Sequence, residues 1–460
     1  MLFQKEIHTT KSYDVVVCGG GFSGFAAAYA AARDGTKTIL IERNFCLGGV
    51  GTQALVNHIL GERKWVDDRI HTCVGGIFDK VEETLLAEQA GADYRTVSTN
   101  PTMNPHGWNR SLGLGLIFDN ERMKLLLEQM LVEVGVEISY GTDIIDVIAQ
   151  DGSVSGVIVH NKSGLGIIYG KRFIDATGDG DLCSMSGCDY LMGDENGGLA
   201  AASLEMHVEN VDLDVLREYM QRTKDVRFKS IISDLKARGI WQFPYEIFIS
   251  VLLTKPNVFM INTIRQVGID GTDAASVTQG IIDGRRESYE LLAIMRAHFP
   301  GFENASIRQI APVMGIRETR RIQTDYTLSI QDLIEGKDFD DCIAFSGYGW
   351  DMPNPKHPSY QPYQGVTRKS PFTPIPFRCL LPVGLDNVLV IGRCIGAERE
   401  ALGPVRVMAP CLAMGEAAGI ASALSIQEKR SYRQLNVSEL QEKIKAYGGI
   451  VGKDQIRVIP

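Results

Sequence analysis

The chain has 460 residues, more than the roughly 250 to 300 at which one hydrophobic core stops growing, so we expect at least two domains. Hydrophobic residues make up 44% and charged residues 22%, and no stretch approaches the roughly 20 apolar residues of a membrane helix. The net charge of -9 argues against nucleic acid as a partner, because proteins that bind it usually present a basic face.

The N-terminal residues 1–10 contain Lys5, Glu6 and His8 and no continuous apolar core, so they do not resemble a secretory signal. The nine cysteines include no C-x-x-C pair, and we interpret them as reduced thiols of a cytoplasmic protein. No metal site is predicted, and Cys183 and Cys188 are interpreted as small buried residues. Cys46 is the exception, because nearby backbone amides at a glycine pair could lower its pKa.

The strongest signal lies in the first fifty residues. Residues 13–18 contain a β-branched run typical of a buried parallel strand. Gly19, Gly21 and Gly24 then complete the pattern G-x-G-x-x-G, and the alanine-rich residues 25–33 predict a helix. Glycines let the backbone approach a pyrophosphate, and the helix N-terminus supplies amides and partial positive charge.

An acidic residue follows at the spacing that this motif requires. A second strand is predicted over residues 38–41 and ends at Glu42, which lies 18 residues after Gly24. An acid at about this distance binds the ribose hydroxyls of a dinucleotide. Strand, turn, helix, strand and acid occur in order, so a dinucleotide site is favoured over simple helix–strand packing, with NAD and FAD both still open.

Later features favour FAD. Gly48, Gly49 and Thr52 allow a second close backbone approach just after Glu42. Further strands are predicted at residues 136–139, 143–148, 154–159, 166–169, 171–175 and 388–391. A small-residue helix over about 406–423 would point its N-terminus at the flavin's pyrimidine oxygen and N1. An NAD domain needs none of these pieces.

The middle of the chain predicts a second domain. Between about residues 188 and 378 the glycine-rich motifs disappear, with strands predicted at 258–265 and 306–313 and a helix at 277–298. We expect an α/β protein: a Rossmann-like FAD-binding domain formed by 1–187 and 379–430, an inserted α+β substrate domain (188–378), and a C-terminal helix and tail (431–460). An insertion at 55–118 is expected over the flavin, followed by a helix that Asp119 caps.

Eight prolines fall between Pro353 and Pro382, with Trp350, Tyr360 and Tyr363 among the aromatic residues nearby. This density of proline excludes a helix or a central strand. A rigid loop near the ligand and a plain surface connection are both compatible with this segment.

Taken together, these motifs resemble the FAD-dependent oxidoreductase family of the two-dinucleotide-motif flavoprotein class. The resemblance rests on the segments GGGFSG, LGG, FIDATGDGDL, INTIRQVGIDGTD, GIRETRRI, IPFRCLLP and VLVIGRCIGAEREALGPVRVMAPCLAMGEAAG and spans about residues 12–450. It implies that the FAD is lined by Gly19, Gly21, Ser23, Gly24, Glu42, Arg43, Gly48, Gly49, Ile144, Thr177, Gly178, Asp179, Gly392, Arg406, Val407 and Met408. The chain departs from the family where histidines are expected: it has Gly396-Ala397-Glu398-Arg399 and Asp351-Met352-Pro353.

Candidates for the chemistry are fewer. Arg317, Arg320 and Arg321 could clamp an anion, or could form an internal salt-bridge network with Glu318. Arg399 and Arg406 are placed to stabilise an anionic reduced flavin. His106 and His357 have pKa values suited to acid/base work, although each is more simply a loop histidine. We predict Arg317, Arg320, His357 and Arg399 as the catalytic set.

The function predicted from the sequence is hydride transfer between a small-molecule substrate and flavin N5. A flavin-dependent monooxygenase or halogenase that uses NAD(P)H and oxygen is the second hypothesis. A non-catalytic flavin-binding protein and a nicotinamide-only enzyme are the remaining alternatives. The substrate stays open, because fold does not determine it, and neither a nucleic acid nor a membrane is expected as partner, although a homo-oligomer is possible.

Overall fold

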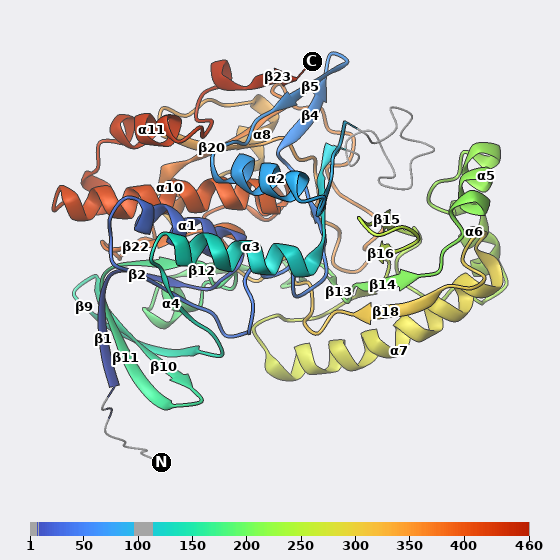
Figure 1. Ribbon diagram of the computed structural model, residues 1–460, viewed down its shortest axis with the longest axis horizontal. Coiled ribbons are helices and arrows are strands. Elements are labelled where there is room, and N and C mark those ends of the chain that lie inside the picture. Colours follow the sequence, from blue (N-terminus) through green and yellow to red (C-terminus); the bar gives the residue numbers. More distant parts are fainter. Residues whose placement is uncertain (1–6, 8, 96–113, 460) are drawn as a thin grey trace.

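The computed structural model describes residue 7 and residues 9–95 and 114–459 (Figure 1). Its largest sheet has the strand order β8-β2-β1-β11-β10-β9, and β22 also pairs with β11. These strands are β1 (Thr9–Cys18), β2 (Thr38–Ile41), β8 (Glu137–Ser139), β9 (Asp143–Gln150), β10 (Ser153–Asn161), β11 (Gly164–Asp175) and β22 (Val388–Val390). The pairs among β8, β2, β1, β11 and β22 are parallel, which confirms the Rossmann-like α/β prediction.

Strand β11 joins the parallel part of this sheet to an antiparallel part. Its first half pairs with β10, its last residues pair with β22, and β1 runs beside it from Thr9 to Cys18. The sequence predicted two strands here, 166–169 and 171–175, with a break at Gly170. The strand is continuous because Gly170 pairs with Tyr13 of β1, and Val16 packs closely against its Cα.

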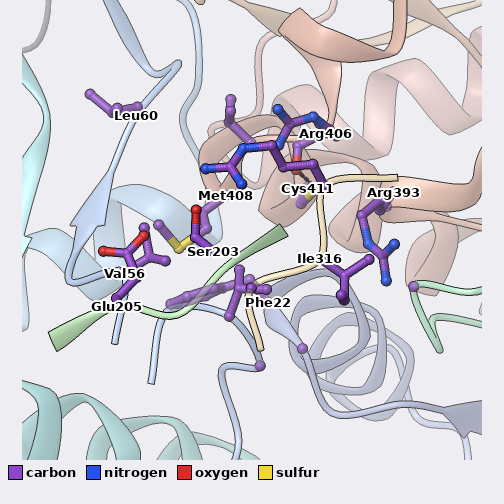
Figure 2. Close-up of a pocket in the computed structure, with 18 of the residues that line it drawn as sticks. Phe22, Val56, Leu60, Ser203, Glu205, Ile316, Arg393, Arg406, Met408 and Cys411 are labelled. Atoms are coloured by element: carbon purple, nitrogen blue, oxygen red, sulfur yellow. Dashed lines mark hydrogen bonds between the residues drawn. The ribbon is translucent and has the colours of Figure 1, made fainter. Parts of the chain in front are cut away.

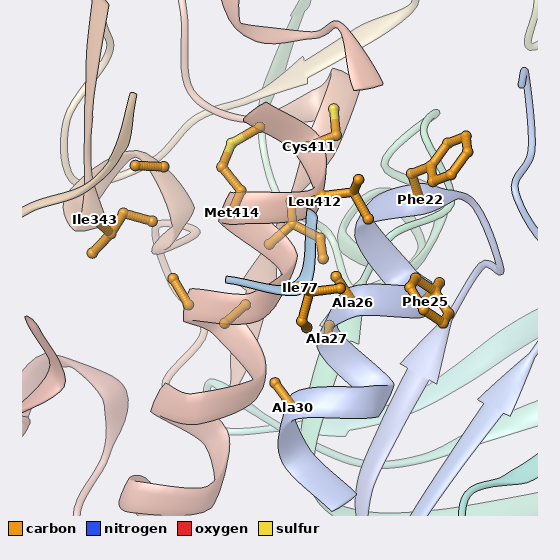
Figure 3. Close-up of a cluster of buried hydrophobic side chains, with 14 of the residues drawn as sticks. Phe22, Phe25, Ala26, Ala27, Ala30, Ile77, Ile343, Cys411, Leu412 and Met414 are labelled. Atoms are coloured by element: carbon orange, nitrogen blue, oxygen red, sulfur yellow. The ribbon is translucent and has the colours of Figure 1, made fainter. Parts of the chain in front are cut away.

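Two helices of small residues pack face to face above the sheet. Helix α1 (Phe22–Arg33) and helix α10 (Met408–Gln427) are buried along most of their lengths. Gly415 faces the Ser23 carbonyl and Gly419 faces the Ala27 carbonyl so closely that a methyl group would clash at either position. Figure 3 shows this contact, with Ala26, Ala27 and Ala30 of α1 on the side that faces α10 and with Leu412 of α10 turned toward α1. Close approach of small residues therefore fixes the helix that follows the glycine turn.

Helix α10 is, among the described residues, the one helix long and apolar enough to cross a membrane. Its most apolar window is 89% buried inside the protein, against α1 and the sheet strands. Its apolar character matches its position in the core.

The middle section has a hydrophobic core of its own (Figure 1). A four-stranded antiparallel sheet has the order β15-β16-β14-β18, formed by β14 (Met206–Glu209), β15 (Ser250–Leu252), β16 (Phe259–Ile261) and β18 (Ser306–Ile310). The helices here are α5 (Leu213–Thr223), α6 (Lys229–Ala237) and α7 (Ala274–His298). Phe228 is at the centre of this core: it stacks on Phe299 at 4.7 Å and on Tyr219 at 5.0 Å between ring centroids.

Short strands and helices make up the rest of the fold. The small sheets pair β12 (Tyr190–Met192) with β19 (Arg320–Ile322), β13 (Ala202–Ser203) with β17 (Arg265–Gln266), and β20 (Cys342–Ser346) with β21 (Thr373–Pro376). Two further sheets contain β3 (His58–Ile59), β7 (Leu116–Phe118) and β6 (Gly91–Ala92), and β23 (Arg457–Ile459), β5 (Arg69–Thr72) and β4 (Arg63–Val66). The remaining α-helices are α2 (Ile77–Ala87), α3 (Asn120–Glu133), α4 (Asp181–Met185), α8 (Ile330–Glu335), α9 (Arg399–Val405) and α11 (Val437–Ala446).

Two predicted elements differ from the structure. The strand expected over 258–265 is divided into β16 and β17, because the chain leaves the four-stranded sheet after Ile261 and pairs instead with β13. The helix expected over about 406–423 begins only at Met408 as α10, because Arg406 is the C-cap of a separate preceding helix, α9, and the chain breaks between the two helices. Pro404 lies inside α9, near this break.

Candidate active site

A cavity of about 1000 Å³ lies between the two regions and is lined by both. At one end it begins at the glycine turn after β1 and at Glu42. At the other end it reaches Tyr245, Met260 and Arg265 of the middle section. A single continuous cavity therefore connects the predicted dinucleotide site with residues more than 200 positions later in the sequence.

The glycine turn has room for a ligand on its open side. Gly19 has a φ of +107°, and a methyl group there would lie 2.3 Å from the Ala176 carbonyl oxygen, so only glycine fits. A methyl group at Gly21 would meet no protein atom within 4 Å, and Gly21 lines the cavity. Gly21 is the N-cap of α1 without a side-chain cap, and the first turn carries no acid. The amides of this turn are thus available to a pyrophosphate, as FAD requires.

Glu42 is held against the same turn. One carboxylate oxygen accepts the Gly20 N–H at 2.7 Å, and the other accepts the Asn44 N–H at 2.8 Å. The carboxylate lines the cavity although the residue is only 6% exposed. Its position beside the glycines fits the predicted role on the adenosine ribose.

Asp179 and Arg393 form a second polar group on the cofactor wall. Asp179 accepts hydrogen bonds from Arg393 at 2.7 Å and from the Thr319 hydroxyl at 2.8 Å. Burial opposes ionisation of this carboxyl, but Arg393 and the hydrogen bonds keep the pKa of Asp179 below its ordinary value. Asp179 is thus an anion at neutral pH, and Arg393 is fixed beside it at the cavity wall.

The N-terminus of α10 also faces the cavity. Its N-cap Val407 makes no side-chain cap, its first turn has no acid, and Val407 and Met408 line the cavity. Figure 2 shows Arg406, Met408 and Cys411 on this wall, with Ser203 of β13 and Glu205 from the connection that follows it in the middle section. Arg406 donates to the backbone oxygen of Asp351 at 2.8 Å and to its carboxylate at 3.2 Å.

The far end of the cavity carries buried charge. Strand β13 pairs with β17, and Ser203 also bridges to Gly315, which brings together residues from three separate segments. Glu205, Arg265 and Arg317 therefore line one end of the cavity, and they are 1%, 6% and 9% exposed.

Among the carboxyl groups at this end of the cavity, Glu205 has the pKa that is shifted most. Burial raises the pKa of Glu205 to about 8, and the opposing charges of Arg317 and Arg265 offset this effect only in part. Its Oε2 has no hydrogen-bond partner among the described residues. Burial also raises the pKa of the cavity residue Glu62 to about 8, but its Oε1 accepts the Leu116 N–H at 3.2 Å.

Most residues predicted for the cofactor line the cavity. They are Gly19, Gly21, Ser23, Glu42, Arg43, Gly48, Gly49, Thr177, Gly178, Asp179, Gly392, Arg406, Val407 and Met408. Three others lie outside the lining. Gly24 packs against the Gly19 carbonyl, Thr52 donates its hydroxyl to the Leu47 carbonyl, and Ile144 packs on the outer core of the sheet. Gly24 and Thr52 thus support the glycine turn and its neighbouring loop through the protein itself.

The predicted catalytic residues are dispersed. Arg317 lines the cavity. Arg320 is bound to Asp181 at 2.8 Å, and Arg399 is bound to Glu318 at 2.7 Å, both outside the lining. His357 is exposed in the proline-rich loop, and His106 lies outside the described residues. The salt-bridge alternative therefore describes Arg320 and Arg321, which pair with Asp181 and Glu318, whereas Arg317 has no ion pair among the described residues.

Cys46 does not have the predicted environment. Burial is the largest influence on this thiol, and it raises the pKa of Cys46 above its ordinary value. The prediction of a lowered pKa is wrong, because the protein screens this half-buried thiol from water more strongly than nearby groups stabilise a thiolate.

The cavity is also lined by residues that were not predicted from the sequence: Glu205, Arg265 and several residues of the loop after β20, including Tyr348 and Gln361. Arg265 lies inside the quoted segment INTIRQVGIDGTD, so its position in a strong motif was an available signal. No sequence pattern marked Glu205 as a site residue, because the residues around it read as an ordinary strand. Trp350, Gln361 and Gln364 line the cavity, which favours the ligand-side interpretation of the proline-rich loop.

The sequence matches the model of the FAD dependent oxidoreductase family over residues 14–444, and the chain belongs to this family. Its cofactor is FAD. It is 29% identical to a digeranylgeranylglycerophospholipid reductase of Picrophilus torridus over 31% of this chain and 39% of the relative. It is 29% identical to digeranylgeranylglycerophospholipid reductase 2 of Methanothermobacter thermautotrophicus over 33% of this chain and 36% of the relative. The matches thus span less than two fifths of the length of these relatives.

Among solved structures, a geranylgeranyl bacteriochlorophyll reductase-like protein of Thermoplasma acidophilum is similar with a TM-score of 0.48 and 14% identity. This similarity covers 95% of this chain and 84% of that one.

Proposed function

We propose that this protein transfers a hydride between a small organic substrate and flavin N5, with the substrate bound at the middle-section end of the cavity. The observation that carries the proposal is the continuity of the cavity from the glycine turn to Glu205 and Arg265. We propose residues 188–378 as the substrate domain, since they supply that end.

The residues at the cofactor end would bind and orient FAD. The open side of Gly21 and the amides of α1 would hold the pyrophosphate, and Glu42 the ribose hydroxyls. The uncapped N-terminus of α10 would stabilise negative charge on the pyrimidine side of the ring. When bound, FAD supplies the hydride acceptor and donor, and the protein supplies position and charge.

A hydride leaving an alcohol or amine carbon requires that a proton leave the attached oxygen or nitrogen. Glu205 is the proposed proton acceptor, at its unpartnered Oε2. A pKa of about 8 places this group near neutral pH, where a general base or acid is most effective. Glu62 also has an Oε2 without a partner among the described residues, but it is a weaker candidate because its Oε1 already binds the Leu116 amide and Arg63.

The test is anaerobic titration of the oxidised holoprotein with alcohols, sugars, amines and hydroxy acids, followed by flavin absorbance. We expect one class to bleach the flavin. Glu205→Gln should slow the reduction about 10²-fold or more while FAD stays bound. Glu287→Gln is the matched control: burial also raises the pKa of Glu287, to about 7, but this residue lies outside the cavity lining.

Two outcomes would overturn the proposal. The first is flavin that no organic compound reduces and that NAD(P)H reduces rapidly, with oxygen then consumed, which is the monooxygenase result. The second is flavin that neither organic donors nor dithionite reduce, which is the result for a non-catalytic binding protein.

A further inference from the structure

Arg265 is a buried arginine without a polar partner. Its residue is 6% exposed and lines the cavity. Among the described residues its guanidinium has no hydrogen bond or ion pair, and its Nε is fully buried. The Tyr245 ring centroid lies 4.5 Å from the guanidinium carbon, and Glu205 is near enough for the two charges to interact. Its backbone is fixed by pairing with Ser203. Burying an unpaired charge is costly, so a ligand that supplies the missing acceptor is expected.

The groups around Arg265 do not balance its charge. Burial, followed by repulsion from Arg265, lowers the pKa of Arg317 to about 9. Arg317 donates one hydrogen bond, to the Ala201 carbonyl at 2.6 Å, and no carboxylate lies within ion-pair distance of it among the described residues. Arg406 is already paired with Asp351. In the ionised form of Glu205, which the proposed proton acceptance requires, the three arginines exceed the two carboxylates by one positive charge. In the protonated form, which its raised pKa favours at neutral pH, they exceed Asp351 alone by two.

We infer that Arg265 and Arg317 form the binding site for a carboxylate group on the substrate, an inference that rests on the proposed function. A guanidinium presents parallel N–H donors that match a carboxylate, and a desolvated site strengthens such charge-assisted hydrogen bonds. Met260, Ile281 and Met314 line the same end of the cavity and give an apolar surface for the remainder of an organic acid. In the proton-accepting form, the excess of one charge matches a monocarboxylate better than a phosphate ester, which carries about 1.5 to 2 negative charges at pH 7.

The experiment is isothermal titration calorimetry on oxidised holoprotein, without turnover. The probes are acetate, isobutyrate, benzoate and phenylacetate, each with its uncharged amide, and phenyl phosphate. We expect at least one carboxylate to bind about 10-fold or more tightly than its amide and than phenyl phosphate. Arg265→Gln should lower the affinity for that carboxylate at least 10-fold and leave the affinity for the amide unchanged.

Arg286→Gln is the matched control, because it removes the same charge from an exposed site on α7. It should leave the affinity unchanged within about 2-fold. Arg317→Lys should also lower the affinity for the carboxylate, since lysine keeps the charge but lacks the paired donors of arginine. If Arg265→Gln does not fold, the comparison of Arg317→Lys with wild type and Arg286→Gln decides the matter.

Equal affinity for acid and amide would overturn the inference, as would tighter binding of phenyl phosphate, no binding by any probe, or loss of affinity in Arg286→Gln as large as in Arg265→Gln. These outcomes are separable from failure of the proposed function. Flavin bleached by an uncharged donor, with no carboxylate bound, would leave hydride transfer standing and remove the carboxylate site. Carboxylate binding without flavin reduction by any donor would leave the carboxylate site standing and remove hydride transfer.

Discussion

The cofactor end and the substrate end of the cavity are built in opposite ways. At the cofactor end, backbone atoms make the site: the Gly21 turn and the starts of α1 and α10 offer amides without side-chain caps. At the substrate end, side chains make the site, and they are charged, buried and poorly partnered, as Glu205 and Arg265 show. A backbone site can stay fixed while the side-chain site changes, which allows one fold to serve many substrates.

The largest expected effect concerns the buried ion pairs of Glu318, which join the middle section to the cofactor region. Glu318 is 1% exposed and accepts two hydrogen bonds from Arg399, at 2.9 and 2.7 Å, and one from Arg321. Glu318→Gln would leave the buried Arg321 without a carboxylate and Arg399 with Glu400 alone, and we expect the free energy of unfolding to fall by about 3 to 5 kcal/mol in urea denaturation. Glu335→Gln, on the surface helix α8, is the control. An unchanged unfolding midpoint in Glu318→Gln would show that this network does not anchor the domains.

The second effect separates packing from ligand binding at the cofactor end. A methyl group at Gly24 would lie 1.9 Å from the Gly19 carbonyl oxygen, whereas one at Gly21 meets no protein atom. Gly24→Ala should therefore destabilise the apoprotein by about 2 to 3 kcal/mol. Gly21→Ala should leave the apoprotein melting temperature nearly unchanged and weaken FAD binding about 10-fold or more, measured by flavin fluorescence. The reverse pattern would mean that Gly24 faces the cofactor.

The third effect sharpens the description of the substrate end. Because burial raises the pKa of Glu205 from 4.5 to about 8, the folded protein binds this proton more tightly than the unfolded chain does. Stability should thus fall as pH rises from about 4.5 to 8. Glu205→Gln removes this contribution, so its gain in unfolding free energy over wild type should be about 4 kcal/mol larger at pH 8.5 than at pH 5. A gain independent of pH would show that Glu205 is ionised throughout.

The smallest effect concerns the thiol beside the cofactor loop. Burial raises the pKa of Cys46, so at pH 7.5 iodoacetamide should modify it no faster than a free cysteine. Mass spectrometry of the labelled peptide measures the rate, with urea-unfolded protein as reference. Faster labelling than in the unfolded chain would restore the prediction of an activated thiol.

The sequence was informative where local geometry carries the function. The glycines at 19, 21 and 24 and the acid at 42 are spaced by the turn, the helix and the strand that they build, so position along the chain predicts position in space. The substrate end depends on segments that meet only after folding: Arg265 is brought to Ser203 by the β13–β17 pair. Arg399 was misplaced for the same reason, because its partner Glu318 is 81 residues away in the chain.

The pairing of β22 with β11 and of α10 with α1 has a consequence for biosynthesis. The first cofactor segment leaves the ribosome early, but its helix cannot bury its alanine face until residues 408–427 have been made. The central sheet likewise lacks one parallel neighbour of β11 until residue 390. We therefore expect FAD to be retained only after nearly the whole chain has emerged, with the middle section folding first around its own aromatic core.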